Sequence, residues 1–328
     1  FSTTQINALS TGQIQALETT DLQALTTTSI AQLSNPLLKA LTATQIGDLA
    51  DTQVLALTET QLGQLGGTQI RGFEVTDLGT LTTTQLSLLS STQISAFNTT
   101  QVKALGDTQF SGLSTTQITG FTSTQLNALE TTDLQALTTT QVAGLSTTQV
   151  KALSTTQITD LTDAQAAVLT GAQITALSAT QAAALDVTDF AAFTTTQSAA
   201  LTATQLGTLD ATDLGSLSTT NIALLSTTQL KGLTGTQVGN LGDTQVLALT
   251  ETQIASLSAT QVKGFETTDL GTLTTTQLGQ LTTTQVAAFT ATQLKALGDT
   301  QFAGLSTTQV SGLTATQIAL LETTDLQE

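Results

Sequence analysis

Acidic residues recur in pairs along this chain, and the two members of each pair are three positions apart. The pairs are Glu18 with Asp21, Glu74 with Asp77, Glu130 with Asp133, Asp186 with Asp189, Asp210 with Asp213, Glu266 with Asp269, and Glu322 with Asp325. Carboxylates of this kind, helped by neighbouring hydroxyl and carbonyl oxygens, are groups that bind Ca²⁺. Duplication of one variant segment explains the same pairs, because acids are favoured at helix N-termini and no EF-hand-like spacing is present. We favour duplication, keep these residues as candidate calcium ligands, and expect no other cofactor.

The same carboxylates lack the partners that acid–base catalysis requires. The chain contains no His, Cys, Tyr, Trp or Met. An active site brings unlike groups to one point, whereas this chain repeats like groups along a line. We therefore predict that the protein is not an enzyme.

The acidic pairs belong to an eight-residue unit, here called the octad, which repeats 41 times from Phe1 to Glu328 without insertion or deletion. Residues 145–152, Leu-Ser-Thr-Thr-Gln-Val-Lys-Ala, are a typical octad. A unit this short cannot bury a face alone, so octads must stack on one another. We expect one uninterrupted array over residues 1–328, cut from a longer repeat protein, with residues 1–136 duplicated as 193–328.

Each octad carries both signals of a helix N-terminus. Position 2 is Ser or Thr in 28 octads and position 5 is Gln in 31, which is the pattern of a capping box. The Leu or Phe at position 1 and the mostly aliphatic residue at position 6 are the partners of a hydrophobic staple. The next cap residue ends one helix and starts another. The sequence therefore predicts an all-α solenoid of 41 short capped helices, one per octad.

A rotation of 100° per residue places positions 3 and 7 on one side of such a helix, with positions 5 and 1 opposite. All basic residues stand at position 7, and they are Lys39, Arg71, Lys103, Lys151, Lys231, Lys263 and Lys295. Positions 3 and 7 are therefore predicted to face water. Position 4 is Thr in 37 octads, and we predict that it bonds the backbone of an adjacent coil instead of forming a flat, ice-binding array of hydroxyls.

The number of octads per coil is three or two. The position-1 Phe residues differ by multiples of 24, which favours three octads, with the rings stacked on one edge; they are Phe1, Phe73, Phe97, Phe121, Phe193, Phe265 and Phe289. The unusual position-6 residues Ala166, Ala182 and Ser198 are 16 apart and favour two. A β-solenoid is the alternative fold. In a continuous strand, positions 1, 3, 5 and 7 would share one face, so the position-1 residue would lie on the charged face. A corner inside each octad can change which positions share a face and so keeps this alternative open.

Composition excludes two classes of partner. The net charge is -17 with only seven basic residues, so binding to nucleic acid through phosphates is disfavoured. No apolar run approaches the roughly 18 residues of a membrane span, so we expect no membrane insertion.

The octads resemble, along the whole chain, the Thr-Gln-rich octapeptide-repeat regions of very large secreted bacterial surface and adhesin-like proteins, through the unit Leu-Thr-Thr-Thr-Gln-Val-x-Ala. The resemblance implies an extracellular location at the cell surface and a role as a rod, stalk or filament. Because neither end carries a polar cap, we expect the partner to be the chain itself or neighbouring repeats, in end-to-end or lateral fibre contacts. The alternative function is a binding module whose repetitive face docks a glycan, a mineral or ice.

Overall fold

The computed structural model describes residues 1–319 and residue 321. Over this range each octad forms one α-helix of four to six residues, 40 helices in all, and no strand is present. The prediction of an all-α solenoid is confirmed, and the β-solenoid alternative is wrong. The candidate residues Glu322 and Asp325, together with the predicted helix of the last octad, lie outside the described residues.

Contacts between residues divide the chain into two compact units, Phe1–Val168 and Leu169–Glu328. The helices of the first unit are α1 (Thr3–Asn7), α2 (Thr11–Gln15), α3 (Thr19–Gln23), α4 (Thr27–Ala31), α5 (Asn35–Ala40), α6 (Ala43–Gly47), α7 (Asp51–Leu55), α8 (Glu59–Gln64), α9 (Gly67–Ile70), α10 (Val75–Thr80), α11 (Thr83–Ser87), α12 (Ser91–Ala96), α13 (Thr99–Lys103), α14 (Asp107–Gly112), α15 (Thr115–Ile118), α16 (Ser123–Asn127), α17 (Thr131–Ala136), α18 (Thr139–Gly144), α19 (Thr147–Ala152), α20 (Thr155–Thr159) and α21 (Asp163–Ala166). The helices of the second unit are α22 (Gly171–Ala176), α23 (Ala179–Ala182), α24 (Val187–Ala192), α25 (Thr195–Ala200), α26 (Ala203–Leu206), α27 (Ala211–Ser216), α28 (Thr219–Leu224), α29 (Thr227–Leu230), α30 (Gly235–Gly239), α31 (Asp243–Ala248), α32 (Glu251–Ser256), α33 (Ala259–Val262), α34 (Thr267–Thr272), α35 (Thr275–Gly279), α36 (Thr283–Val286), α37 (Ala291–Lys295), α38 (Asp299–Ala303), α39 (Thr307–Ser311) and α40 (Ala315–Ile318).

The predicted capping boxes start most of the helices, α19 among them. In α19 the Ser146 hydroxyl accepts from the Gln149 N–H at 3.2 Å, and Gln149 Oε1 accepts from the Ser146 N–H at 2.9 Å. Ser146 has an extended backbone, with φ -67° and ψ 155°, and Leu153 at the other end of the helix is extended as well, with φ -62° and ψ 142°. Because an extended residue cannot continue a helix, each octad contributes one short helix followed by a corner.

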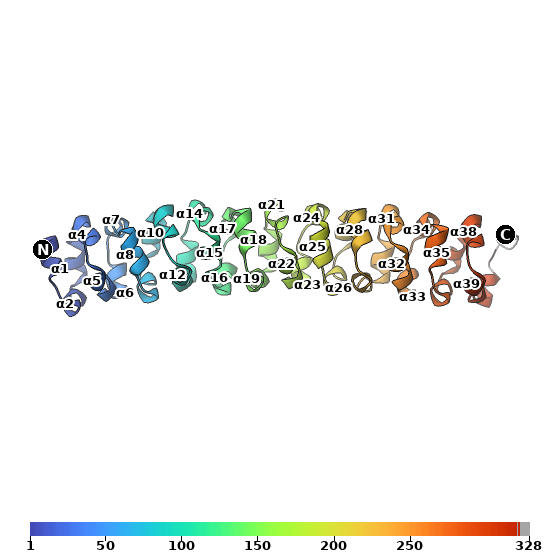
Figure 1. Cartoon of the computed structure of the whole chain (residues 1–328), viewed down its shortest axis with the longest axis horizontal. Helices are drawn as coiled ribbons and strands as arrows, with labels where there is room; N and C mark the ends of the chain where they lie inside the picture. Colours follow the sequence, from blue (N-terminus) through green and yellow to red (C-terminus); the bar gives the residue numbers. More distant parts are fainter. Residues whose placement is uncertain (320, 322–328) are drawn as a thin grey trace. The chain divides into compact units, whose positions relative to one another are not determined.

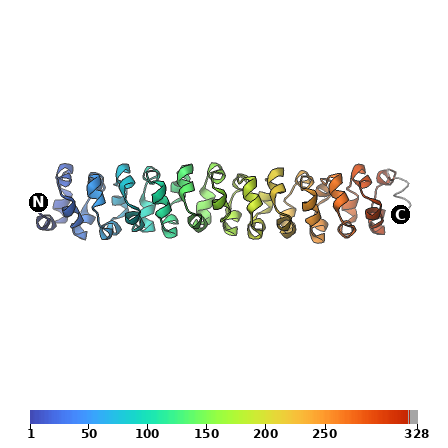
Figure 2. The ribbon, with the colours of Figure 1, turned by 90° about the horizontal axis from the view of Figure 1, so that it is seen from above.

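Within each unit, helices pack against the helix three octads further along the chain. In the first unit α4 packs on α7 and α7 on α10, which lie in successive turns (Figure 1). In the second unit α25 packs on α28 and α28 on α31, and Figure 2 shows the stacking within each unit from a second direction. A coil therefore contains three octads, so the prediction of three is confirmed and the two-octad alternative, suggested by Ala166, Ala182 and Ser198, is wrong.

Positions 1 and 6 form the core of each unit. The position-6 side chains from Ile6 to Val286 are almost all fully buried, and the position-1 Leu and Phe residues of the inner coils are nearly so. The ring contacts among the described residues join position-1 Phe to position-6 Phe, as in Phe110 with Phe121 at 6.4 Å and Phe190 with Phe193 at 5.0 Å between ring centroids. The three-octad coil places Phe73, Phe97 and Phe121 on one edge in successive coils, as predicted, whereas the ring contacts join the two core positions.

Small residues at position 8 allow the coils to approach closely. A Cβ atom placed on Gly72 would lie 2.1 Å from the carbonyl oxygen of Ala43, and one placed on Gly232 would lie 2.2 Å from that of Ala203. In both cases position 8 of one octad faces position 3 of the octad one coil earlier. Gly at these positions is thus required by backbone packing between coils.

Candidate functional site

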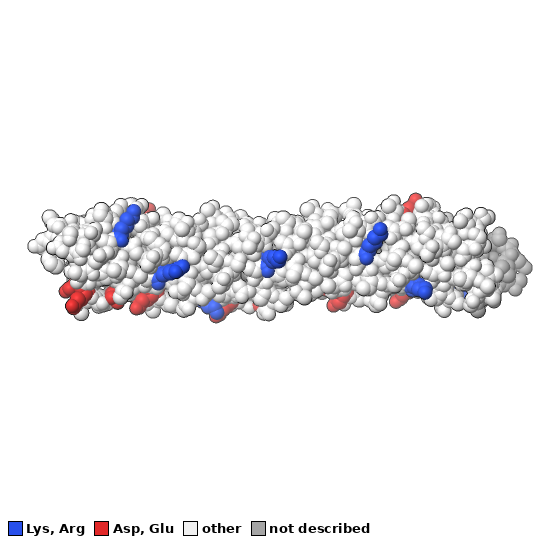
Figure 3. Space-filling view, turned by 90° about the horizontal axis from the view of Figure 1, so that it is seen from below, with Lys and Arg blue, Asp and Glu red and all other residues white. Residues whose placement is uncertain are grey.

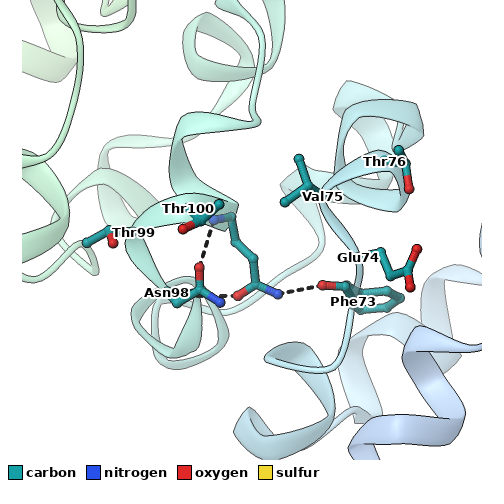
Figure 4. Close-up of a pocket in the computed structure, with 8 residues that line it drawn as sticks. Phe73, Glu74, Val75, Thr76, Asn98, Thr99 and Thr100 are labelled. Carbon is teal, nitrogen blue, oxygen red and sulfur yellow. Dashed lines mark hydrogen bonds between the residues drawn. The ribbon is translucent and has the colours of Figure 1, made fainter.

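The Gln at position 5 joins two successive coils. Oε1 of Gln101 accepts from the Asn98 N–H at 2.9 Å, as the capping box requires. Its Nε2 donates to the carbonyl oxygen of Ile70 at 3.2 Å and to that of Phe73 at 2.8 Å, both in the preceding coil. Figure 4 shows the bond to Phe73. One side chain therefore caps its own helix and also bonds the backbone of the preceding coil, at the corner against which that helix packs.

The same pair of bonds recurs along both units, and we call the set the glutamine ladder. Gln149 donates to Ile118 and Phe121, both at 2.9 Å. Gln261 donates to Leu230 at 2.7 Å and to Leu233 at 2.8 Å. The acceptors lie 31 and 28 residues earlier, at position 6 and at the following position 1. The ladder thus supplies a donor to the position-1 carbonyl group, which lies just past the end of a short helix. It adds a second donor to the position-6 carbonyl group, as at Leu230, which also accepts from the Leu233 N–H at 3.0 Å.

The absence of Glu at position 5 is the one sequence feature that indicates the ladder, and the capping-box prediction did not use it. Glu completes a capping box as well as Gln does, yet position 5 contains Gln in 31 octads and never Glu. A carboxylate cannot donate to two carbonyl groups, so this exclusion of Glu indicates a use for the amide NH₂ group. The prediction that Thr at position 4 bonds the adjacent coil is wrong. Position 4 is exposed in every described octad, and the Thr180 hydroxyl bonds Ser178 of its own octad instead of another coil.

Positions 3 and 7 face water as predicted, since every charged residue at these positions is exposed in the described octads. Some position-7 side chains also contact the next coil. Arg71 Nε donates to the carbonyl of Ala96 at 3.0 Å, and the Asn127 amide donates to that of Ala152 at 2.9 Å. Lys103 forms an ion pair with Glu130 at 3.7 Å. Most of the surface is uncharged on the face shown in Figure 3, where acidic side chains gather along one edge.

In the five acidic pairs from Glu74–Asp77 to Glu266–Asp269, the structure places the two members in different environments. The position-2 acid is an exposed N-cap, whereas Asp at position 5 is buried in the coils above the first, with Asp77 and Asp269 each only 1% exposed. Asp77 Oδ2 accepts from the Glu74 N–H at 2.9 Å, so it retains the capping bond of Gln. An ionised Asp has no hydrogen to donate, and these octads therefore lack both ladder bonds to the preceding coil.

Burial changes the protonation of these Asp residues. Desolvation raises the pKa of Asp77, Asp213 and Asp269 to about 6, and nearby carboxylates add to the effect. A hydrogen bond from the cap N–H acts in the opposite direction at each site and lowers the pKa. Desolvation also raises the pKa of Asp133, where Lys103 partly offsets the shift.

No three acidic side chains meet in an arrangement that could hold a metal ion anywhere in residues 1–319. Asp186 and Asp210 instead bond the start of their own helices. Asp186 accepts from the Thr188 and Asp189 N–H groups at 2.8 and 3.0 Å, and Asp210 does the same in its octad. Such bonds use the acid at position 2 as a helix cap.

A surface groove lies between α10 and α13, and its volume is about 560 Å³. Phe73, Glu74, Val75 and Thr76 form one wall, and residues 98–101 form the other (Figure 4). Glu74 is the single titratable side chain of this groove, so it offers no pair of unlike groups for catalysis. Over the described part of the chain, no helix has the length and apolar character needed to cross a membrane.

Comparison with known families identifies a repeat. The model of the ALTTAQ repeat matches residues 70–107, 126–163 and 262–299. All three matched segments begin at position 6 of an octad and end at position 3. The chain is therefore similar to a known repeat type in those segments, which supports the assignment as a repeat protein. No curated protein matches the chain.

Proposed function

We propose that this chain is a structural repeat protein of the bacterial cell surface, an adhesin-like spacer whose stacked coils form an extracellular rod, stalk or filament. The glutamine ladder carries this proposal. Its bonds join side chain to backbone, so they attach one coil to the next whatever residues the surface bears. A scaffold of this kind can be lengthened by adding octads, which is the property a spacer requires.

The surface supports a passive role. The outward positions 3 and 7 mix Thr, Ala, Gly, Ser, Asn, Lys and acids, and the groove between α10 and α13 contains one titratable group. We therefore propose that the protein is not an enzyme and uses no cofactor. The extracellular location rests on the resemblance to Thr-Gln-rich surface proteins.

We propose further that the partner is the chain itself or neighbouring repeats, joined end to end by the contacts that join coils inside each unit. Inside each unit every ladder Gln donates to carbonyl groups of the preceding coil, as Gln149 does to Ile118 and Phe121. One side of a coil thus offers amide donors and the other offers carbonyl groups, and head-to-tail contacts of this kind do not close into a ring unless the geometry forces it.

Electron microscopy and light scattering of the 328-residue chain test this proposal. We expect filaments of uniform width whose length increases with protein concentration. Ile318→Lys should shorten them because a buried charge is costly at the contact, whereas Thr316→Lys, at an exposed position of the same octad, should not. A discrete monomer at all concentrations, or equal effects of the two variants, would contradict the end-to-end contact.

One observation favours the second candidate, a binding module. The Thr residues at position 4 are exposed in every described octad that carries them, and they form rows along each unit. Binding to insoluble polysaccharide or mineral, and inhibition of ice recrystallisation, can be measured for the wild type and for Thr84→Lys with Thr108→Lys. Loss of binding in that variant would favour this candidate over the spacer.

A further inference from the structure

Acids at position 3 are placed beneath the buried Asp residues of the next coil. Every position-3 Asp in the chain precedes a position-5 Asp by 26 residues, and the pairs are Asp51 with Asp77, Asp107 with Asp133, Asp163 with Asp189, Asp243 with Asp269, and Asp299 with Asp325. Because a coil contains three octads, this spacing sets the two octads directly on top of each other. Among the described residues, three of these pairs, Asp51–Asp77, Asp107–Asp133 and Asp243–Asp269, lie wholly inside one unit. In the first and third the two carboxyls lie within hydrogen-bonding reach of each other.

In the first unit, α10 packs on α7, and the Asp51 carboxyl lies within hydrogen-bonding reach of the Asp77 carboxyl. In the second unit, α34 packs on α31, and Asp243 lies within the same reach of Asp269. The lower acid of each pair is exposed and the upper one is buried. Both pairs therefore place a second carboxyl near the point at which ordinary octads make the ladder bonds.

The charged groups around each pair are few. Asp77 faces Asp51 from α7 and Glu74 from its own cap, and α13, stacked on the other side, ends in Lys103. Lys103 is paired with Glu130 at 3.7 Å.

Asp269 has the equivalent surroundings. It faces Asp243 from α31 and Glu266 from its own cap, and α37 on the other side ends in Lys295. No basic group contributes to the shift at either buried Asp. Two carboxylates so close together without a cation favour retention of one proton.

We propose that the Asp51–Asp77 and Asp243–Asp269 pairs are proton-linked contacts, in which one shared proton joins two stacked coils and its loss weakens their attachment. The protonated Asp77 donates its Oδ hydrogen to the Asp51 carboxylate, and this bond takes the place of the missing ladder bonds. When both acids are ionised, the bond is lost and the like charges repel. The proposal is independent of the spacer function, since it concerns contacts inside each unit.

The sign of the pH dependence follows from burial. Desolvation raises the pKa of Asp77 and of Asp269 to about 6, whereas an Asp in an open coil titrates near 3.9. The proton is therefore bound more tightly when the coils are closed. The stabilisation is fully present below about pH 4 and is lost as the pH rises through about 6.

Hydrogen exchange measured by mass spectrometry tests this contact in the intact chain. Peptides spanning 46–56 and 70–80 report the first pair, and peptides spanning 238–248 and 262–272 report the second. After correction for intrinsic exchange rates, protection at both pairs should rise roughly tenfold between about pH 7.5 and about pH 5. Asp77→Asn should remove this rise at the first pair and leave it at the second, and Asp269→Asn should do the reverse.

Asp21→Asn is the matched control, because Asp21 occupies the same octad position but is exposed and has no coil beneath it. It should leave both pH profiles unchanged. Asp77→Gln restores the ordinary octad and should protect the first pair at about pH 7.5, so it keeps the test decisive if Asp77→Asn does not fold. The proposal is wrong if Asp77→Asn keeps the wild-type profile, or if millimolar Ca²⁺ protects the wild type at about pH 7.5 to the extent that low pH does, which would make the pair a cation site.

Discussion

Replacement of one ladder Gln measures how much the contacts between coils contribute to stability. Gln149 is buried and makes the capping bond to the Ser146 N–H at 2.9 Å as well as two ladder bonds at 2.9 Å. Gln13 makes only the capping bond, to the Ser10 N–H at 2.8 Å, and is exposed. The same substitution at the two positions therefore separates the ladder from the cap.

The expected difference follows from the bonds that are lost. Removal of a cap costs about 1 kcal/mol, and this loss is common to Gln149→Ala and Gln13→Ala. Gln149→Ala also deprives two carbonyl groups of a donor, at about 1 kcal/mol for each bond. We therefore expect a cost of about 3 kcal/mol for Gln149→Ala and about 1 kcal/mol for Gln13→Ala.

Native-state hydrogen exchange is the suitable assay, because long repeat arrays do not unfold in a single two-state step. Opening free energies from amides of residues 118–121 and 146–153 report Gln149, and those of residues 10–17 report Gln13. Equal costs at the two positions would show that the ladder bonds add no stability, and the account of coil stacking would then be wrong.

Four further outcomes follow from the same contacts. Gln149→Glu should be more destabilising than Gln149→Ala at about pH 7.5 and should recover as the pH falls, because it places an ionised carboxylate against two carbonyl groups; urea titrations at two pH values measure this. Leu249→Ala should cost about 2–5 kcal/mol by leaving a cavity, whereas Thr252→Ala, at exposed position 4, should stay within about 0.5 kcal/mol, as local opening free energies from hydrogen exchange can show. Ser198→Ala should stabilise the chain by about 1 kcal/mol, since the buried Ser198 hydroxyl has no hydrogen-bond partner, and calorimetry would reveal a lower midpoint if this is wrong. The thermal midpoint of the wild type should decrease as the pH is raised from about 5 to about 7.5. Asp77 and Asp269, with pKa values of about 6, hold protons in the folded state at pH values where the unfolded chain has already released them.

Local signals made the helices predictable. The cap at Ser146, the Gln three residues later and the staple between positions 1 and 6 all lie within nine residues of one another, so each octad specifies its own helix start. The number of octads per coil was also predictable, because the spacings between position-1 Phe residues are multiples of 24 residues, the length of three octads. The outward positions of the basic residues followed from helical rotation alone.

The contacts between coils were not predictable in the same way. The acceptors of Gln149 lie 31 and 28 residues away, and a helical wheel does not show which backbone lies beneath a side chain. The wheel also left position 4 on a flank, so Thr at that position was assigned the contact that Gln makes. Burial raises the pKa of Asp77, and Asp51 in the preceding coil adds to the shift. That neighbour becomes apparent only once the coil length is known.

Disulfide formation between engineered Cys residues tests the three-octad coil most directly, because the chain has no Cys of its own. A Cβ atom on Gly144 would lie 3.4 Å from the Thr115 Cβ, close to the roughly 3.5–4.5 Å between the Cβ atoms of a disulfide. Thr115→Cys with Gly144→Cys should therefore form an intramolecular disulfide under mild oxidation. Ser123→Cys with Gly144→Cys, the pair that a two-octad coil would bring together, should stay reduced. A disulfide in the second variant and none in the first would contradict the coil on which the glutamine ladder depends.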